Sequence, residues 1–105
     1  MNLNSKTWKN KKESDSNSIC LDVRTKDEFD EGYINGATNV DFYDSANFVS
    51  HLSNIDKKKS YYVYCRSGKR SYAASEIMKD LGFKNVYNLE SGYLGWVESG
   101  YETIG

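Results

Sequence analysis

The 105-residue sequence contains no proline, only two cysteines and only one histidine. Because the two cysteines do not form a C-x-x-C pair, this composition excludes an ordinary zinc site and a disulfide-stabilised scaffold. No apolar run approaches the length of a transmembrane helix, and residues 1–18 lack the continuous apolar stretch of a secretory signal. We therefore expect a cytoplasmic protein with no membrane partner, no metal and no cofactor.

The chain also lacks an excess of charge of either sign. Fourteen lysine and arginine residues face fifteen aspartate and glutamate residues, which gives a formal net charge of −1. A dedicated nucleic-acid-binding domain normally carries a basic excess, so nucleic acid is not an expected partner. The length suits one domain, and the nine tyrosines are expected to supply much of its core volume.

From residue 19 onwards, short apolar runs alternate with helical patterns. Strands are predicted at 19–23, 37–40, 61–64 and 86–89, and helices at 26–31, 45–55, 71–81 and 92–97. Thr25 and Glu28 match a capping box at the first of these helices, and Ser45 is the expected cap of the second. This order predicts an α/β fold with a mainly parallel sheet. The polar residues 1–18 are set apart as an N-terminal segment, and the domain is expected over 19–105.

Cys65 is the first candidate for chemistry, because it follows the third predicted strand and opens a basic loop. Only three arginines occur in this lysine-rich chain, and two of them, Arg66 and Arg70, lie in that loop. In open α/β sheets the ligand site lies beyond the carboxyl ends of the strands. The loop amides, the start of the next helix and the nearby cations favour a thiolate. Cys65 is therefore a predicted nucleophile, whereas Cys20 in mid-strand is expected to be packed.

Two chemistries use a cysteine in such a loop. In phosphatases of the C-x5-R type, an arginine six residues after the cysteine grips the phosphate oxygens. Here Ser71 occupies that position, and Arg70 comes one residue too early. A loop one residue smaller suits a single sulfur atom, such as the anionic outer sulfur of a cysteine persulfide. The loop therefore favours sulfur transfer over phosphoryl transfer.

Four sequence blocks, in this order and spacing, form one pattern. They are Leu21-Asp22-Val23-Arg24 with Glu28-Phe29, Glu31 to Ala37, Cys65 to Ser71, and Asn88-Leu89 with Ser91-Gly92 and Gly95-Trp96. In these blocks the chain resembles the rhodanese family of single-domain sulfurtransferases. That family usually has His and Pro where Tyr33 and Asn35 stand, and a glycine pair that begins where Ser91 stands. The resemblance implies a rhodanese-like α/β fold with a mainly parallel five-stranded sheet flanked by helices.

The resemblance also assigns roles to individual residues. Cys65 is implied to be the catalytic sulfur carrier, and Asp22, Arg24 and Ser71 are implied to support its loop. Ser71 is also expected at the start of the helix, and Arg24 is expected to pair with Glu28 on the next helical turn. The implied substrate-binding residues are those of the loop itself: Arg66, Ser67, Gly68, Lys69 and Arg70.

The predicted activity is transfer of a sulfane sulfur from thiosulfate or a similar anion to cyanide or a thiol acceptor. Thioredoxin and glutathione are candidate acceptors. A sulfur relay or a regulatory module that acts with a protein partner stays open, because donor and acceptor lie outside the motif. A C-x5-R-like phosphatase or an arsenate reductase is a further alternative, and the loop length opposes it.

Overall fold

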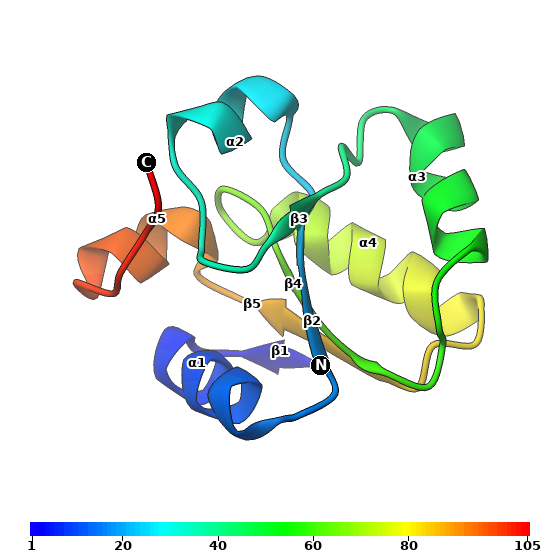
Figure 1. The fold of residues 1–105 in the computed structure, drawn as a ribbon, viewed down its shortest axis with the longest axis horizontal. Coiled ribbons are helices and arrows are strands. Elements are labelled where there is room, and N and C mark those ends of the chain that lie inside the picture. Colours follow the sequence, from blue (N-terminus) through cyan, green and yellow to red (C-terminus); the bar gives the residue numbers. More distant parts are fainter.

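Five parallel strands form a single sheet in the computed structural model, which describes all 105 residues (Figure 1). The order across the sheet is β1-β5-β4-β2-β3, so β4 is the middle strand. The strands are β1 (Asn2–Leu3), β2 (Ser18–Asp22), β3 (Thr38–Asn39), β4 (Ser60–Tyr64) and β5 (Asn85–Leu89). The helices are α1 (Ser5–Ser14), α2 (Lys26–Glu31), α3 (Ser45–Ser53), α4 (Lys69–Asp80) and α5 (Gly92–Glu98). The predicted α/β fold with a five-stranded parallel sheet is confirmed.

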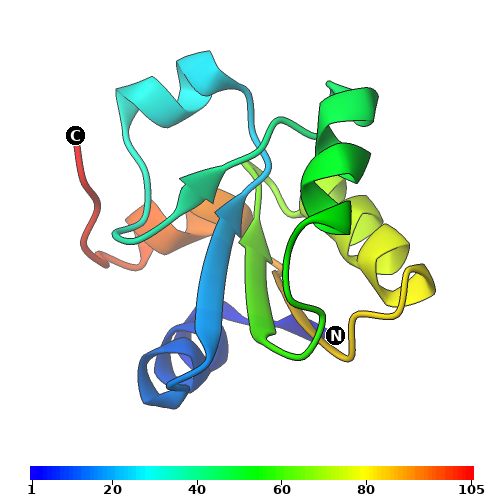
Figure 2. The ribbon, with the colours of Figure 1, turned by 45° about the vertical axis from the view of Figure 1, so that its right-hand side comes forward.

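From Tyr61 to Cys65, successive side chains point alternately to the two faces of the sheet and so enter two separate cores. Tyr61, Val63 and Cys65 pack with α3 and α4 on one face, whereas Tyr62 and Tyr64 pack with α1 and α5 on the other. This division follows from the alternating direction of side chains along a strand. Figure 2 shows the two helical layers on opposite faces of the sheet. The helices add one buried set to each core: Phe48, Leu52, Ala74 and Met78 to the first, and Trp8 and Trp96 to the second.

Local signals place most of the helices and strands, and several of their ends differ from the sequence prediction. The capping box of Thr25 and Glu28 is present at α2. The predicted cap at Ser45 is wrong, because the carboxylate of Asp44 accepts the N–H of Asn47 and caps α3, of which Ser45 is the first residue. The predicted strand 37–40 is paired only over β3, at the sheet edge. Helix α4 begins at residue 69, two residues before the predicted start, because the positive φ of Gly68 turns the chain directly into the helix.

The polar segment 1–18 forms β1, which joins the sheet, and α1, which packs on one of its faces. Strand β1 pairs with β5, and the side chain of Asn4 caps α1 by accepting the N–H of Thr7. Trp8 is fully buried and makes an edge-to-face contact with Trp96. Its indole N–H donates to the carbonyl of Tyr87 (3.1 Å). A single tryptophan thus anchors an otherwise polar helix to the domain core.

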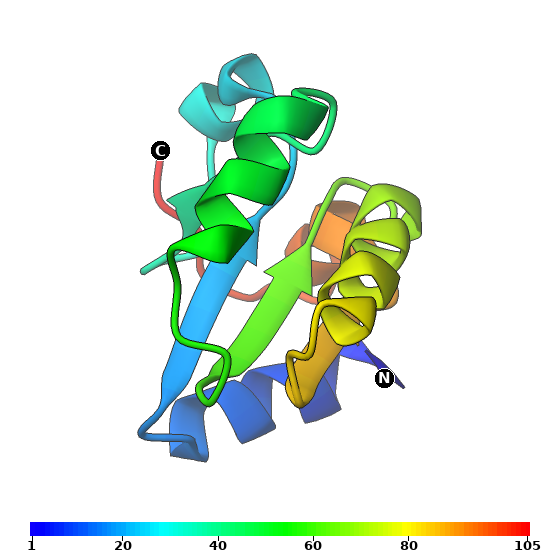
Figure 3. The same ribbon diagram turned by 90° about the vertical axis from the view of Figure 1, so that its right-hand side faces the viewer.

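The carboxyl ends of the parallel strands meet at one edge of the sheet. Figure 3 shows β2 and β4 side by side with their ends at that edge, and the loop after β4 leads from it into α4. The segment that follows β2 lies at the same edge, so Asp22 and Cys65 come from adjacent strand ends. None of the five helices is both long and apolar enough to cross a membrane.

Candidate active site

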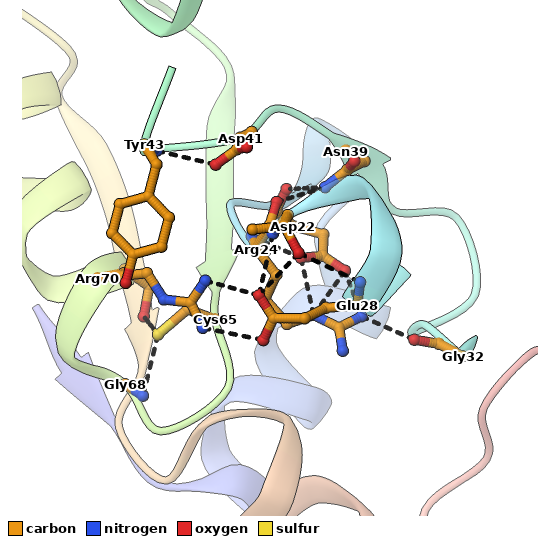
Figure 4. Close-up of polar contacts among 12 residues, drawn as sticks. Asp22, Arg24, Glu28, Gly32, Asn39, Asp41, Tyr43, Cys65, Gly68 and Arg70 are labelled. Carbon is orange, nitrogen blue, oxygen red and sulfur yellow. Dashed lines mark hydrogen bonds and ion pairs between the residues drawn. The ribbon is translucent and has the colours of Figure 1, made fainter. Parts of the chain in front are cut away.

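Cys65 lies at the floor of the loop that joins β4 to α4, and it is fully buried. Its Sγ accepts a hydrogen bond from the backbone N–H of Gly68 (3.1 Å), as Figure 4 shows. It accepts a second hydrogen bond from the hydroxyl of Ser71 (3.3 Å). Helix α4 begins beside the sulfur, so the partial positive charge of its N-terminus faces the loop. The amide, the hydroxyl and the helix together stabilise negative charge on this sulfur. Ser71 is the third residue of α4, so its expected place at the helix start is wrong, while its contact with Cys65 is direct.

Helix α5 holds the loop from behind. The N–H of Tyr93 donates to the carbonyl of Cys65 (2.8 Å), and the N–H of Leu94 donates to the carbonyl of Arg66 (3.1 Å). Gly92 permits this close approach: its φ is +67°, and a Cβ there would overlap the Arg66 carbonyl. The first two loop carbonyls are thereby fixed by backbone amides of α5.

A second contact holds the far end of the loop. Gly68 has a φ of +94°, and a Cβ there would collide with the carbonyl of Glu90, so only glycine fits. The Asn88 side-chain amide donates to the carbonyl of Gly68 (3.2 Å) and to Oδ1 of Asn2 (2.7 Å). Strands β5 and β1 thus help to fix the residue whose N–H contacts the sulfur.

The predicted substrate-binding side chains fall into two groups. Arg66, Ser67 and Lys69 are exposed, and neither of the two cations forms an ion pair. Arg70 differs, because both ends of its guanidinium are bound by Glu28, with Nη1–Oε1 at 2.8 Å and Nη2–Oε2 at 3.0 Å. Two of the three loop cations are therefore free to meet an anion, and the third is neutralised.

The ion pair between Glu28 and Arg70 stabilises the charged form of both groups. The Arg70 guanidinium lowers the pKa of Glu28 to about 2, with help from the backbone N–H of Thr25. Glu28 in turn raises the pKa of Arg70. Tyr43 covers the guanidinium, with the charge 5.1 Å from its ring centre. The N–H of Tyr43 is bound by the carboxylate of Asp41 (2.8 Å), which holds this turn before α3.

The expected pairing of Arg24 with Glu28 is wrong, because Arg24 binds Asp22. Arg24 Nη2 lies 2.6 Å from Asp22 Oδ2 and 2.7 Å from the carbonyl of Gly32, and the Asp22–Arg24 pair is buried. The hydroxyl of Tyr64 donates to the same carboxylate (2.7 Å), and burial raises the pKa of this phenol. Residues two apart at the end of an extended strand point the same way, which brings Asp22 and Arg24 together.

The Asp22–Arg24 pair reaches the cysteine loop through an aromatic ring. The Arg24 guanidinium lies 4.3 Å from the ring centre of Tyr93, within cation–π distance. The N–H of Tyr93 holds the carbonyl of Cys65, so the pair supports the loop through α5. Beside Arg66 the surface forms a hollow of about 170 Å³. Its lining residues are Arg24, Glu28, Glu31, Gly32, Arg66, Tyr93 and Leu94.

Cys20 is separated from Cys65 by the sheet. It packs in the core under α1 and α5, whereas Cys65 belongs to the core under α3 and α4. Burial raises the pKa of the Cys20 thiol to about 12. Cys20 therefore stays a neutral, packed thiol, as its position in mid-strand predicts.

The structure gives four residues a role at the site that the sequence analysis did not predict. These are the Arg70 partner Glu28, the covering Tyr43, and the two loop supports Asn88 and Gly92. Gly92 carried a visible signal, because a glycine before an aromatic helix marks a turn. Tyr43 carried none, since an exposed tyrosine in a turn says nothing about a contact with a distant arginine.

Comparison with known proteins gives one family over most of the chain. The family model described as "Rhodanese-like domain" matches residues 5–99. The chain is 35% identical over 88 residues to the putative sulfurtransferase YtwF of Bacillus subtilis, which covers 84% of this chain and 82% of that protein. It is 34% identical over 93 residues to a putative mitochondrial thiosulfate sulfurtransferase of Schizosaccharomyces pombe, covering 78% of this chain and 65% of that one. The chain spans less than two thirds of the length of several curated relatives.

Solved structures of rhodanese-related proteins share the fold of this chain. The crystal structure of a rhodanese-related protein from Thermoplasma volcanium superposes with a TM-score of 0.85 at 27% identity, and the match covers 98% of this chain and 96% of that one. The family match begins at residue 5, which is the first residue of α1, so it includes the helix that Trp8 anchors. The chain belongs to the rhodanese-like domain family.

Proposed function

We propose that the protein is a sulfurtransferase that carries a sulfane sulfur as a persulfide on Cys65. The donor is thiosulfate or a similar anion, and the acceptor is cyanide or a thiol. The observation that carries the proposal is the pair of hydrogen bonds from the Gly68 amide and the Ser71 hydroxyl to the Cys65 sulfur. Both donors stabilise negative charge on Sγ, and the thiolate is the form of the cysteine that attacks a sulfur donor.

The reaction balances in two steps. The Cys65 thiolate attacks the outer sulfur of thiosulfate, a new S–S bond forms, and the old S–S bond breaks with its electron pair leaving on sulfite. Cyanide or a thiolate then attacks the outer sulfur of the persulfide. The S–S bond to Cys65 breaks with its electron pair on Sγ, so the Cys65 thiolate is regenerated and the product is thiocyanate or a new persulfide. Arg66 and Lys69, both exposed at the loop, attract the anionic donor.

The short loop opposes phosphoryl chemistry. A phosphate bound by a cysteine loop needs an arginine fork that grips two of its oxygens. Position 71 is a serine whose hydroxyl contacts the sulfur, and the fork of Arg70 is bound by Glu28. The native protein is therefore expected not to hydrolyse aryl phosphates. Relatives named as sulfurtransferases or as a sulfur carrier support the sulfur-transfer class.

Intact-mass measurement tests the proposal directly. After incubation with thiosulfate, the protein is expected to gain about 32 Da, the mass of one sulfur, and to lose it on addition of cyanide. Cys65→Ser is expected to abolish both the adduct and thiocyanate formation, whereas the matched control Cys20→Ser retains both. An adduct that forms equally on Cys65→Ser would refute the assignment.

A further inference from the structure

Arg70 is the one loop cation whose charge is matched by a carboxylate, and that carboxylate comes from a different element. Glu28 on α2 binds the guanidinium in a two-point contact, and the N–H and hydroxyl of Thr25 both donate to its Oε1 (3.1 Å each). Tyr43 covers the other side of the guanidinium. The side chains of Arg70 and Glu28 are only 17% and 24% exposed, so solvent screens their interaction weakly. The acid is thus positioned before any substrate arrives.

The pair lies close enough to the sulfur to act on a donor. Figure 4 shows the Arg70 guanidinium between Tyr43 and Glu28, beside the Cys65 sulfur. Arg70 directly precedes Ser71 in α4, and the hydroxyl of Ser71 donates to the Cys65 sulfur (3.3 Å), so the guanidinium belongs to the helical turn that contacts the sulfur. A donor that approaches Cys65 therefore meets a neutral pair where the sequence alone suggests a free cation.

We propose that Glu28 is a specificity-determining residue that lowers the preference of the site for doubly charged over singly charged sulfur donors. The Coulomb energy of a donor scales with the product of its charge and the charge of the site. By neutralising one of three loop cations, Glu28 reduces the attraction of a dianion twice as much as that of a monoanion. It also occupies the N–H groups with which Arg70 would bind a sulfonate. This inference rests on the proposed sulfur transfer.

Two donors of matched chemistry and different charge serve as probes. Thiosulfate carries two negative charges and methanethiosulfonate carries one, and each presents a terminal sulfur to the Cys65 thiolate. In both cases the new S–S bond forms as the old one breaks, and sulfite or methanesulfinate leaves with the electron pair. The measured quantity is the ratio of kcat/KM for thiosulfate to kcat/KM for methanethiosulfonate.

The ratio is expected to follow the charge of the pair. Glu28→Gln keeps the length of the side chain and an acceptor for Thr25, and it is expected to raise the ratio about threefold at low ionic strength. Arg70→Gln leaves the acid unmatched and is expected to lower the ratio, and the double variant is expected to restore it. Asp27→Asn on the same helix is the matched control, because Asp27 is exposed and forms no ion pair. Its ratio is expected to stay that of the native protein.

A merely structural role for Glu28 would give a different result. Loss of loop geometry would lower kcat/KM for both donors alike and leave the ratio unchanged in all variants, and this outcome would overturn the proposal. The Arg70→Gln variant and the double variant keep the test decisive if Glu28→Gln folds poorly. Failure of the underlying sulfur transfer is recognised separately, because the native protein would then form no Cys65 adduct with either donor.

Discussion

Replacement of Gly92 by alanine tests whether α5 shapes the cysteine loop. A Cβ at this position would overlap the carbonyl of Arg66 and lie 2.7 Å from the backbone nitrogen of Ser67. These are backbone atoms of the loop, so they cannot rotate away as a flexible side chain would. The added methyl group must push α5 and the loop apart, which lengthens the hydrogen bonds that hold the carbonyls of Cys65 and Arg66.

Gly36 provides the matched control for the size of the effect. It also has a positive φ (+84°), but a Cβ there would meet no atom within 4 Å. Gly36→Ala should therefore lower the free energy of unfolding only by the cost of a left-handed alanine, about 1 kcal/mol. Gly92→Ala carries a similar conformational cost and an overpacking cost of about 2 kcal/mol, so a loss of about 3 kcal/mol is expected.

Urea denaturation gives the stabilities, and quenched intact-mass measurements give the rate of sulfur loading from thiosulfate. Gly36→Ala is expected to load at the native rate. Gly92→Ala is expected to load at least about tenfold more slowly in buffer where it is folded, because displacement of a reacting group by a fraction of an ångström is costly. Equal stability and equal loading rates for the two variants would refute the support of the loop by α5.

Three further predictions concern the core and the charges. Trp8→Ala is expected to lower the free energy of unfolding by about 3–5 kcal/mol in urea titrations, and a loss below about 1 kcal/mol would contradict the anchoring of α1. Glu28→Gln is expected to be less stable than the native protein above about pH 4.5. Because the pKa of Glu28 is about 2 in the folded protein and higher when unfolded, this difference should vanish as the pH falls towards 2. A pH-independent difference in denaturation series would exclude the ion pair as its cause. Arg66→Ala and Lys69→Ala are each expected to raise KM for thiosulfate about two- to fivefold, more than they change kcat. High salt should reproduce the effect in the native protein, and a KM that is insensitive to salt would argue against recognition by charge.

Most of the fold could be predicted because its elements carry strong local signals. The continuous aromatic and β-branched run before Cys65 is typical of a central strand, and β4 is fully buried in the middle of the sheet. The Thr25 capping box acts within four residues, so its outcome depends little on the rest of the chain. The start of α4 was misplaced because it depends on the left-handed conformation of Gly68, which packing against Glu90 enforces.

Helix α1 shows where periodicity fails as a signal. Trp8 is its only large apolar residue, so no apolar stripe marks the helix in the sequence. Its burial arises from aromatic partners on β4 and α5, which the sequence places far away. Residues 1–18 are polar in composition and yet contribute a strand to the sheet and a helix on one of its faces, with Trp8 as the large buried side chain of that helix.

The charges of the site were the least predictable feature, because an ion pair depends on distance in space. Proximity along the chain favoured a pair between Arg24 and Glu28, yet the strand end directs Arg24 to Asp22 and the fold brings Arg70 to Glu28 from 42 residues away. A count of cations along the loop therefore overstates the charge that a donor meets. Under the proposed sulfur transfer, the charge available to select a donor is the charge left unmatched after the loop has packed against α2, and that charge belongs to the two exposed cations, Arg66 and Lys69.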